Sequence, residues 1–279
     1  MNGPVRRVLR AIVAAISLAA ALPAASADPT AFVCDVKGEV TLNDGGRPPF
    51  LGELIPGSRL KLAAGAQAAV MFVVSGEEFV LKGPGEFVIG KESVSAATGA
   101  APVKRRLASH ADAAVIVQAS KAGTASLRMR SAQVPRPATA GPQYPIGPIA
   151  QLQPLLRWGG DPSATYEVVV TAASGKQVHA GPAKGTTLKL PVKLVAGQSY
   201  AWSVTPREGP PADARFEVLS ADAVQKSDKA RAAARSFGDR VQLALVLQGL
   251  GAAPDAREVW GQLAAERPDI PELAGLSRP

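Results

Sequence analysis

The chain has 279 residues, with 31 Lys and Arg against 23 Asp and Glu, so its formal net charge is +8. The basic residues are scattered rather than gathered in one stretch, which argues against a nucleic-acid partner. The 24 prolines and 27 glycines separate short apolar runs, a pattern typical of a mainly β chain. The length allows more than one domain.

Residues 1–27 have the three parts of a signal peptide. Arg6, Arg7 and Arg10 are basic, 11–22 is an apolar run, and 25–27 is a small-residue cleavage site. We therefore expect cleavage after Ala27 and an exported, periplasmic protein. The apolar run is shorter than the ~20 residues that span a bilayer, so no transmembrane segment is expected in the mature chain.

Cys34 is the single cysteine, which excludes an intramolecular disulfide and a cysteine-based zinc site. We expect it to be a small buried hydrophobe on the first strand, with a redox or acylated thiol as the alternative.

Residues 28–133 are predicted to form a first β domain. Apolar runs predict strands at 68–74 and 78–89, the latter as two strands around a tight turn at 82–85. This hairpin could present an exposed edge to a strand of a partner protein. Weaker signals predict further strands at 113–119 and 125–131.

The spacing of apolar residues and glycines in this region resembles the periplasmic FecR-like domain. The residues that carry the resemblance are Val36, Gly38, Val40, Leu54, Gly57 and Leu60. It implies a compact β unit used in envelope signalling and in exported multidomain proteins. Full-length FecR regulators also have a cytoplasmic sigma-factor-binding part, which we do not expect here because nothing precedes the leader.

The sharpest basic cluster is Lys104, Arg105 and Arg106. We interpret it as a solvated loop. Its functional alternative is contact with an anionic surface, such as lipid headgroups or cell-wall phosphate.

Residues 134–154 contain six prolines and are predicted to be a semi-rigid, extended linker. Residues 155–219 are predicted to form a second β domain. The run from Leu194 to Tyr200 resembles the tyrosine corner of fibronectin type III and immunoglobulin-like sandwiches, which implies a tyrosine hydroxyl bonded to nearby backbone.

Four aromatic residues of this second domain have two possible roles. They could form a sugar-stacking platform, but each lies on the inward phase of a strand, which favours a core position. They are Trp158, Tyr166, Tyr200 and Trp202.

Residues 220–279 change to a period near 3.6, which predicts helices at 223–235, 239–250 and 255–266. The spacing of five residues in this region resembles the second half of a tetratricopeptide repeat: Gly251, Ala256, Trp260, Leu263 and Pro268. The first half differs, because Arg240 and Leu247 occupy two positions where the repeat usually has aromatic residues. One repeat is too few for a binding groove, so we expect it to dock on the sandwich or to add a partner surface.

No motif for catalysis, cofactor or metal binding surrounds His110 or His179, and we interpret both as surface residues. Glu77, Glu78 and Asp213 are weak candidates for a carboxylate pair. We therefore expect a non-catalytic envelope protein without cofactors that acts in protein interaction, scaffolding or signalling. The alternative is a carbohydrate or peptidoglycan binder with a cell-wall polymer as its partner, and an enzyme is less favoured.

Overall fold

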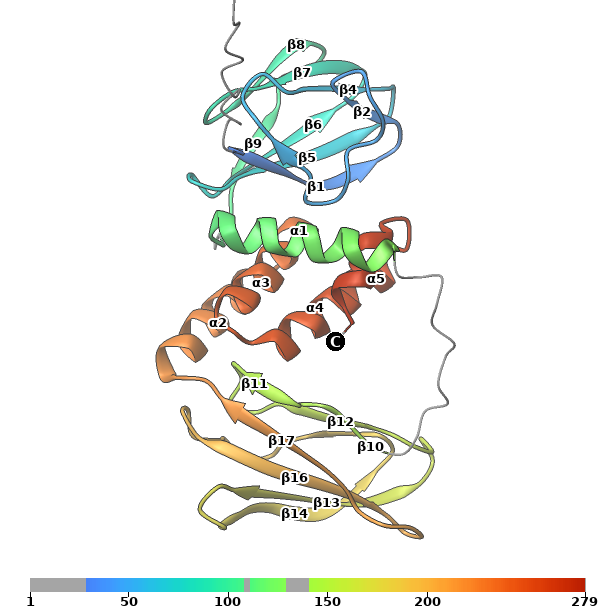
Figure 1. Ribbon diagram of the computed structural model, residues 1–279, viewed down its shortest axis with the longest axis vertical. Coiled ribbons are helices and arrows are strands. Elements are labelled where there is room, and N and C mark those ends of the chain that lie inside the picture. The colour runs from blue at the N-terminus through green and yellow to red at the C-terminus, as the bar shows by residue number, and fades with distance from the viewer. Residues whose placement is uncertain (1–28, 108–110, 129–140, 279) are drawn as a thin grey trace, which may run out of the picture.

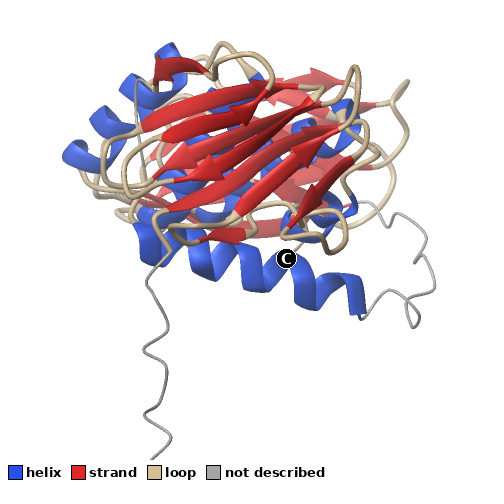
Figure 2. Cartoon of the chain, turned by 90° about the horizontal axis from the view of Figure 1, so that it is seen from above, coloured by secondary structure: helices blue, strands red, loops and turns tan. Residues whose placement is uncertain are grey.

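The computed structural model describes residues 29–107, 111–128 and 141–278. The predicted signal peptide and His110 lie outside these ranges. The described chain is mainly β, with several antiparallel sheets and a group of helices at its C-terminal end. Figure 1 shows three layers, in which the helices lie between two β units. In the view from above, strands lie in front, and helices extend beyond them along two sides (Figure 2).

The first β unit consists of two sheets, with strand orders β3-β1-β5-β6-β9 and β2-β4-β7-β8. Alternation places Leu60 and Leu62 inward, in a hydrophobic cluster to which strands of both sheets contribute. The strands are β1 (Ala31–Lys37), β2 (Val40–Leu42), β3 (Glu53–Leu54), β4 (Arg59–Leu62), β5 (Gln67–Phe72), β6 (Glu77–Lys82), β7 (Gly85–Ile89), β8 (Val94–Thr98) and β9 (Val103–Arg106).

The hairpin predicted at 78–89 is wrong, because its two strands belong to different sheets. Strand β6 pairs with β5 and β9, whereas β7 pairs with β4 and β8. Gly83 lies where the chain crosses between the sheets, and a Cβ at this residue would lie 2.0 Å from the carbonyl oxygen of Ala63. Both strands have neighbours on each side, so this segment offers no free edge to a partner.

The strands predicted at 113–119 and 125–131 are also wrong, because Ala113–Arg128 forms helix α1. The buried residues Ile116, Ala119 and Gly123 recur at helical spacing. This face packs against the C-terminal helices, and that packing outweighs the strand preference of the β-branched run at 115–117. Residues 129–131 lie outside the described ranges.

The three helices predicted at the C-terminus are confirmed, with one short helix in addition. They are α2 (Ala221–Ala233), α3 (Phe237–Gly249), α4 (Ala253–Glu266) and α5 (Pro271–Leu276). Ser220 and Ser236 cap α2 and α3, and Asp239 completes a capping box with Ser236. No described helix is long and apolar enough to cross a membrane.

The second β unit has sheets of order β10-β12-β15 and β11-β17-β16-β13-β14. Its core lies between strands of both sheets and contains Trp158 and Trp202. The strands are β10 (Gly141–Tyr144), β11 (Gly147–Ile149), β12 (Leu155–Gly159), β13 (Thr165–Ala172), β14 (Gln177–Lys184), β15 (Thr187–Lys189), β16 (Ser199–Pro206) and β17 (Ala212–Val218).

The linker prediction fails over residues 141–154, because β10 and β11 lie in this range. Both strands are at sheet edges, where Pro142 and Pro148 need no second hydrogen-bonded neighbour. Proline content therefore marked edge strands here rather than an extended linker. Residues 134–140 lie outside the described ranges.

The helices share one hydrophobic core with the first β unit. The face of β1 and β5 that points away from the unit's own core contributes Phe32, Cys34 and Met71 to this cluster. Trp260 of α4 is fully buried there and meets Phe50 edge to face, with 6.1 Å between ring centroids. The helical layer is therefore bound to the first unit by apolar contacts on the face of β1 and β5.

Candidate functional site

Charged residues concentrate where the helical layer meets each β unit, at two junctions. At the first, Glu78 of β6 is 2% exposed and forms an ion pair with Arg105 of β9. Arg105 also donates from Nη2 to Ser236 Oγ at 2.7 Å, and its Nη1 lies 3.3 Å from Asp239 Oδ2. A strand arginine thus reaches the capped N-terminus of α3 and ties the first unit to the helices.

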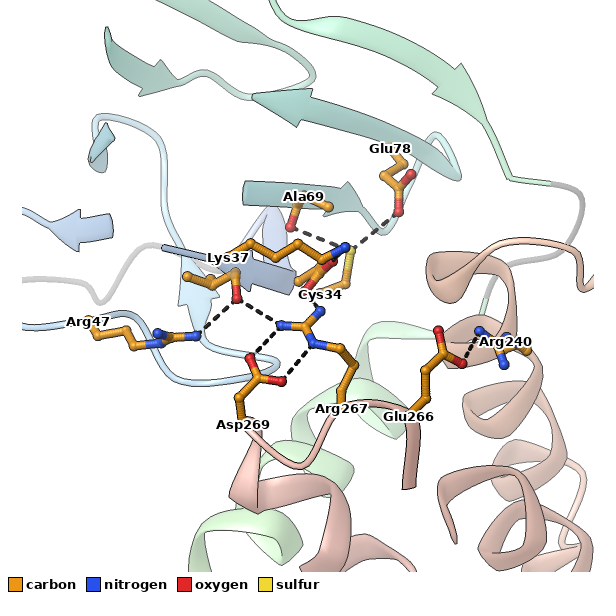
Figure 3. A network of polar contacts seen from close by, with 11 residues as sticks. Cys34, Lys37, Arg47, Ala69, Glu78, Arg240, Glu266, Arg267 and Asp269 are labelled. Carbon is orange, nitrogen blue, oxygen red and sulfur yellow. Dashed lines mark hydrogen bonds and ion pairs between the residues drawn. The ribbon is translucent and has the colours of Figure 1, made fainter. Parts of the chain in front are cut away.

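The protonation states at this junction follow from burial and charge. Burial opposes ionisation of Arg105, but the hydrogen bond and charge of Glu78 outweigh it and raise the Arg105 pKa. Burial and the Glu78 carboxylate both raise the pKa of Cys34. Its thiol lies 3.4 Å from Ala69 O and 3.5 Å from Glu78 Oε1, and stays protonated as a weak donor (Figure 3). The predicted burial of Cys34 is confirmed.

A second contact of the same junction centres on Arg267, which follows α4 (Figure 3). Its Nε and Nη2 each donate to one oxygen of Asp269 at 2.8 Å. Arg267 also donates to two groups of β1. Its Nη1 donates to the Asp35 carboxylate, and its Nη2 donates to the backbone carbonyl of Val36 at 3.0 Å. The hydrogen bond from Arg267 lowers the pKa of Asp269 to about 2.

The second junction centres on Asp255, a fully buried carboxylate in the first turn of α4. It accepts hydrogen bonds from the Tyr144 hydroxyl, from the backbone N–H of Ala150 at 2.7 Å and from Gln151 Nε2 at 2.9 Å. Arg231 Nη2 lies 3.3 Å away. Burial and the charge of Asp255 raise the pKa of Tyr144 above its ordinary value, so this hydroxyl remains a donor.

An ion pair beside Asp255 adds to this junction. Both terminal nitrogens of Arg157, on β12, donate to the Glu258 carboxylate of α4, with 2.6 Å between Nη1 and Oε2. The hydrogen bond to Glu258 raises the pKa of Arg157, and the same guanidinium lies 6.0 Å from the centroid of the Tyr144 ring. The second β unit is therefore bonded to α4 through two adjacent charged contacts.

The four aromatic residues of the second unit are in its core, as expected. Their exposed fractions are 1% for Trp158, 4% for Tyr166, 3% for Tyr200 and 1% for Trp202. The Tyr200 hydroxyl accepts a hydrogen bond from the Val195 backbone N–H at 2.8 Å, which confirms the predicted corner contact. A sugar-stacking platform built on these rings is wrong, because no ring face is free.

The basic cluster at 104–106 is a strand rather than a loop, which corrects the prediction. Alternation along β9 sends Arg105 toward the helices and places Lys104 beside Glu77, with 2.7 Å between their charged atoms. Arg106 is exposed. The three side chains therefore do not form one basic surface.

The residues that carry the predicted resemblance to a tetratricopeptide repeat lie in or beside the helical core. Ala256 and Trp260 are buried in the helical core, and Pro268 follows the end of α4. His179 is half-buried on β14, and Asp213 is exposed on β17. Within the described ranges no three His, Cys, Asp or Glu side chains are grouped to hold a metal ion.

Sequence reasoning named Glu78 and Arg105 only in other roles, and it missed the remaining residues on which both junctions depend. Asp35 and Arg267 are 232 positions apart, and Asp255 lies 111 positions from Tyr144. A local signal was available for only one of them, since Asp255 follows Pro254 at the start of a predicted helix, a position that also suits ordinary helix capping.

The outer face of the larger sheet in the second unit is hollowed. A cavity of 610 Å³ lies beside Ser199, Ala201 and Arg215, and a second of 400 Å³ shares Ala201 and Arg215 with it. Apart from Arg215 and Glu217, the exposed side chains here are short, so the sheet face is open over β13, β16 and β17.

No family model matches the chain, and the comparison with curated proteins finds no relative. Among solved structures, one match is the crystal structure of CopC from Methylosinus trichosporium OB3b. It is 22% identical over 30% of this chain and 96% of that one, with a TM-score of 0.22. A superposition of this quality supports no argument about function.

Proposed function

We propose that this chain is a non-catalytic, exported periplasmic protein that acts as a rigid scaffold for envelope proteins. In this proposal the first β unit is a FecR-like domain, and the second is a fibronectin- or immunoglobulin-like sandwich. The helical layer, with its tetratricopeptide-like segment, holds them at a fixed separation. The leader at 1–27 supports export, and the residue spacings at 36–60 and 194–200 support the two domain types.

One observation carries the proposal: the same helical layer is bonded to both β units through buried or half-buried charged groups. Arg105 and Arg267 make these bonds on one side, and Asp255 and Glu258 on the other. Removing one partner of such a contact leaves a charge without compensation, so the bonds specify one arrangement of the layers. A fixed arrangement suits a protein that holds two partners at a set distance.

The hollowed sheet face of the second unit is the surface that best suits a partner. Its short side chains leave room for the side chains of another protein, and Arg215 and Glu217 at its border can set the orientation. Ala201 lies in both hollows and is exposed, so a large side chain at this position would fill them without disturbing the core.

In-cell crosslinking of the tagged full chain, followed by mass spectrometry, tests this proposal. The variant Ala201→Arg fills the hollows, and Ala97→Arg places the same side chain on an exposed position of β8 in the first unit. We expect an envelope protein to be recovered in near-stoichiometric amounts with the unmodified chain. We expect at least a fivefold loss with Ala201→Arg and little change with Ala97→Arg.

Three results would contradict the proposal in different ways. Recovery of cell-wall fragments in place of protein would favour the carbohydrate-binding alternative. Equal recovery with Ala201→Arg would exclude the sheet face as the partner surface. Recovery of no macromolecule at all would remove the scaffolding role.

A further inference from the structure

A cavity of 350 Å³ lies at the second junction, where the helical layer meets the second β unit. Its lining comes from separate parts of the chain: Tyr144 and Leu155 from the β unit, Arg231 from α2, Arg240 from α3 and Glu258 from α4. The volume is at the lower end of the range that holds small ligands in proteins. The site differs from the sheet-face hollows that the proposed function uses.

The polar groups of this cavity are mainly donors with spare capacity. Arg231 Nη2 is buried and lies 3.3 Å from Asp255, yet it makes no hydrogen bond to a protein atom. Its Nε is held by Ser227 Oγ at 3.2 Å, which fixes the side chain in place. Arg240 is joined to Glu266, a half-exposed residue that a ligand could displace. Nη2 of Arg231 forms an ion pair with Asp255 and, because it is buried, does not open into the cavity. A guanidinium has five N–H donors, and the contacts of Arg231 and Arg240 use only part of them.

The carboxylates nearby are already occupied. Both carboxylate oxygens of Glu258 accept hydrogen bonds from Arg157. Asp255 accepts hydrogen bonds from Tyr144, Ala150 and Gln151. A cationic ligand would therefore compete with guanidinium and backbone donors for these oxygens. An anionic ligand would meet two arginines whose donors are incompletely used.

The remaining wall of the cavity is apolar. Leu243 and Val259 are buried, and Leu155 at the strand end is 43% exposed. Apolar walls with a few convergent polar groups are typical of sites for small organic ligands. We propose that this cavity binds a small organic carboxylate, with its charged end at Arg231 and Arg240 and its apolar body against Leu155 and Val259.

Calorimetric titration of the full mature chain with hexanoate and with hexylammonium tests the charge preference. Both probes have a linear chain of six carbon atoms, and they differ in the sign of the charged end. We expect hexanoate to bind at least tenfold more tightly than hexylammonium. Phosphate tests whether an anion without an apolar body suffices, and we expect it to bind more weakly than hexanoate.

The location is tested at Leu155, because its side chain is already exposed and either charge is tolerated there. Leu155→Glu places a negative charge at the lining and should weaken hexanoate binding about tenfold relative to Leu155→Lys, since the two side chains carry opposite charges. Arg231→Met is a poorer test, because it leaves Asp255 buried without its cation and risks misfolding.

Equal binding of hexanoate and hexylammonium, or no hexanoate binding, would overturn the proposal. Phosphate binding in the absence of hexanoate binding would also overturn it, since the apolar wall would then have no role. Hexanoate binding with equal affinity in Leu155→Glu and Leu155→Lys would place the ligand elsewhere. None of these outcomes bears on crosslinking through the sheet face, so the two proposals fail independently.

Discussion

Gly238 lies in the first turn of α3, against the buried carboxylate of Glu78. A Cβ at this position would lie 2.1 Å from Glu78 Oε1 and 2.9 Å from Arg105 Nη2. Glycine is required here by the close approach of the ion pair and not by an unusual backbone angle. A residue that normally weakens a helix thus permits the first junction to form.

The substitution Gly238→Ala should therefore destabilise the protein by roughly 1–3 kcal/mol, as overpacking does. The control is Gly261→Ala in α4, where the nearest atom, Ser277 Cβ, is at 3.8 Å. This change should stabilise the fold by up to about 1 kcal/mol, through helix propensity alone. Urea unfolding of the two variants measures both effects, and equal stabilisation by both would show that the Glu78 contact is absent.

Asp269 gives the first junction a defined dependence on pH. Its pKa is about 2 in the folded chain because of the hydrogen bonds from Arg267, against 3.8 without them. A lowered folded-state pKa adds stability above about pH 4, and this stability is lost as the pH falls through about 2. The Asp269 side chain is 53% exposed, so solvent screening reduces the effect to about 1 kcal/mol.

Unfolding free energies at pH 6 and pH 2 should therefore differ less in Asp269→Asn than in the unmodified chain. Asp222→Asn is the control, because Asp222 pairs with Lys226 on an exposed helix face. It should leave the pH dependence unchanged. The same reduction in both variants would mean that the hydrogen bonds from Arg267 to Asp269 are not the cause of the pH dependence.

At the scale of elements, α3 and α2 offer a comparison of two serine caps. Ser236 caps α3 and also accepts a hydrogen bond from Arg105, whereas Ser220 caps α2 with a bond to Ala223 N at 3.3 Å. Ser236→Ala should cost about 2 kcal/mol, because it removes the cap and the inter-unit bond. Ser220→Ala should cost about 0.5–1 kcal/mol.

Thermal or urea unfolding of both alanine variants gives these values. The double variant Ser236→Ala/Arg105→Met tests whether the extra cost depends on Arg105, because coupled residues are not additive. Additive losses in the double variant would show that the cap and the arginine act independently.

The elements themselves were predictable to different degrees. Strands such as β13 and β16 alternate cleanly, and the helices at 221–266 carry a clear 3.6 period. Helix α1 was misread because its run at 115–117 is β-branched, a local preference that packing on α5 and α3 overrides. The hairpin at 78–89 was misread because two strands joined by a short turn can still enter different sheets.

At the scale of the whole molecule, Asp255 joins the second β unit to the helices. Asp255→Ala should cost about 3–5 kcal/mol, because it leaves the Tyr144 hydroxyl and the Ala150 N–H without their acceptor and the Arg231 guanidinium without its opposite charge. It should also speed hydrogen exchange over β10 and β11 while the first unit stays protected.

Glu258→Ala is the matched control in the same helix, since Glu258 and Arg157 are partly exposed and the arginine left behind can be hydrated. We expect a loss of less than about 1 kcal/mol and little change in exchange. Hydrogen-exchange mass spectrometry separates the two units. Equal effects of both variants on stability and exchange would contradict the claim that Asp255 holds the second β unit on the helices.

The sequence by itself determined the mainly β class, strands such as β5, β13 and β16, the C-terminal helices, and the hydrogen bond of the Tyr200 corner. Each depends on residues within a few positions of one another, so spacing and periodicity record it. The tertiary structure alone decided which strands share a sheet and which charges meet. Arg267 pairs with Asp35, which is 232 positions away in the sequence, and Arg105 pairs with Asp239, which is 134 positions away. These pairings exist because packing of the apolar sheet face on the helices brings their backbones together, and no local pattern specifies that contact.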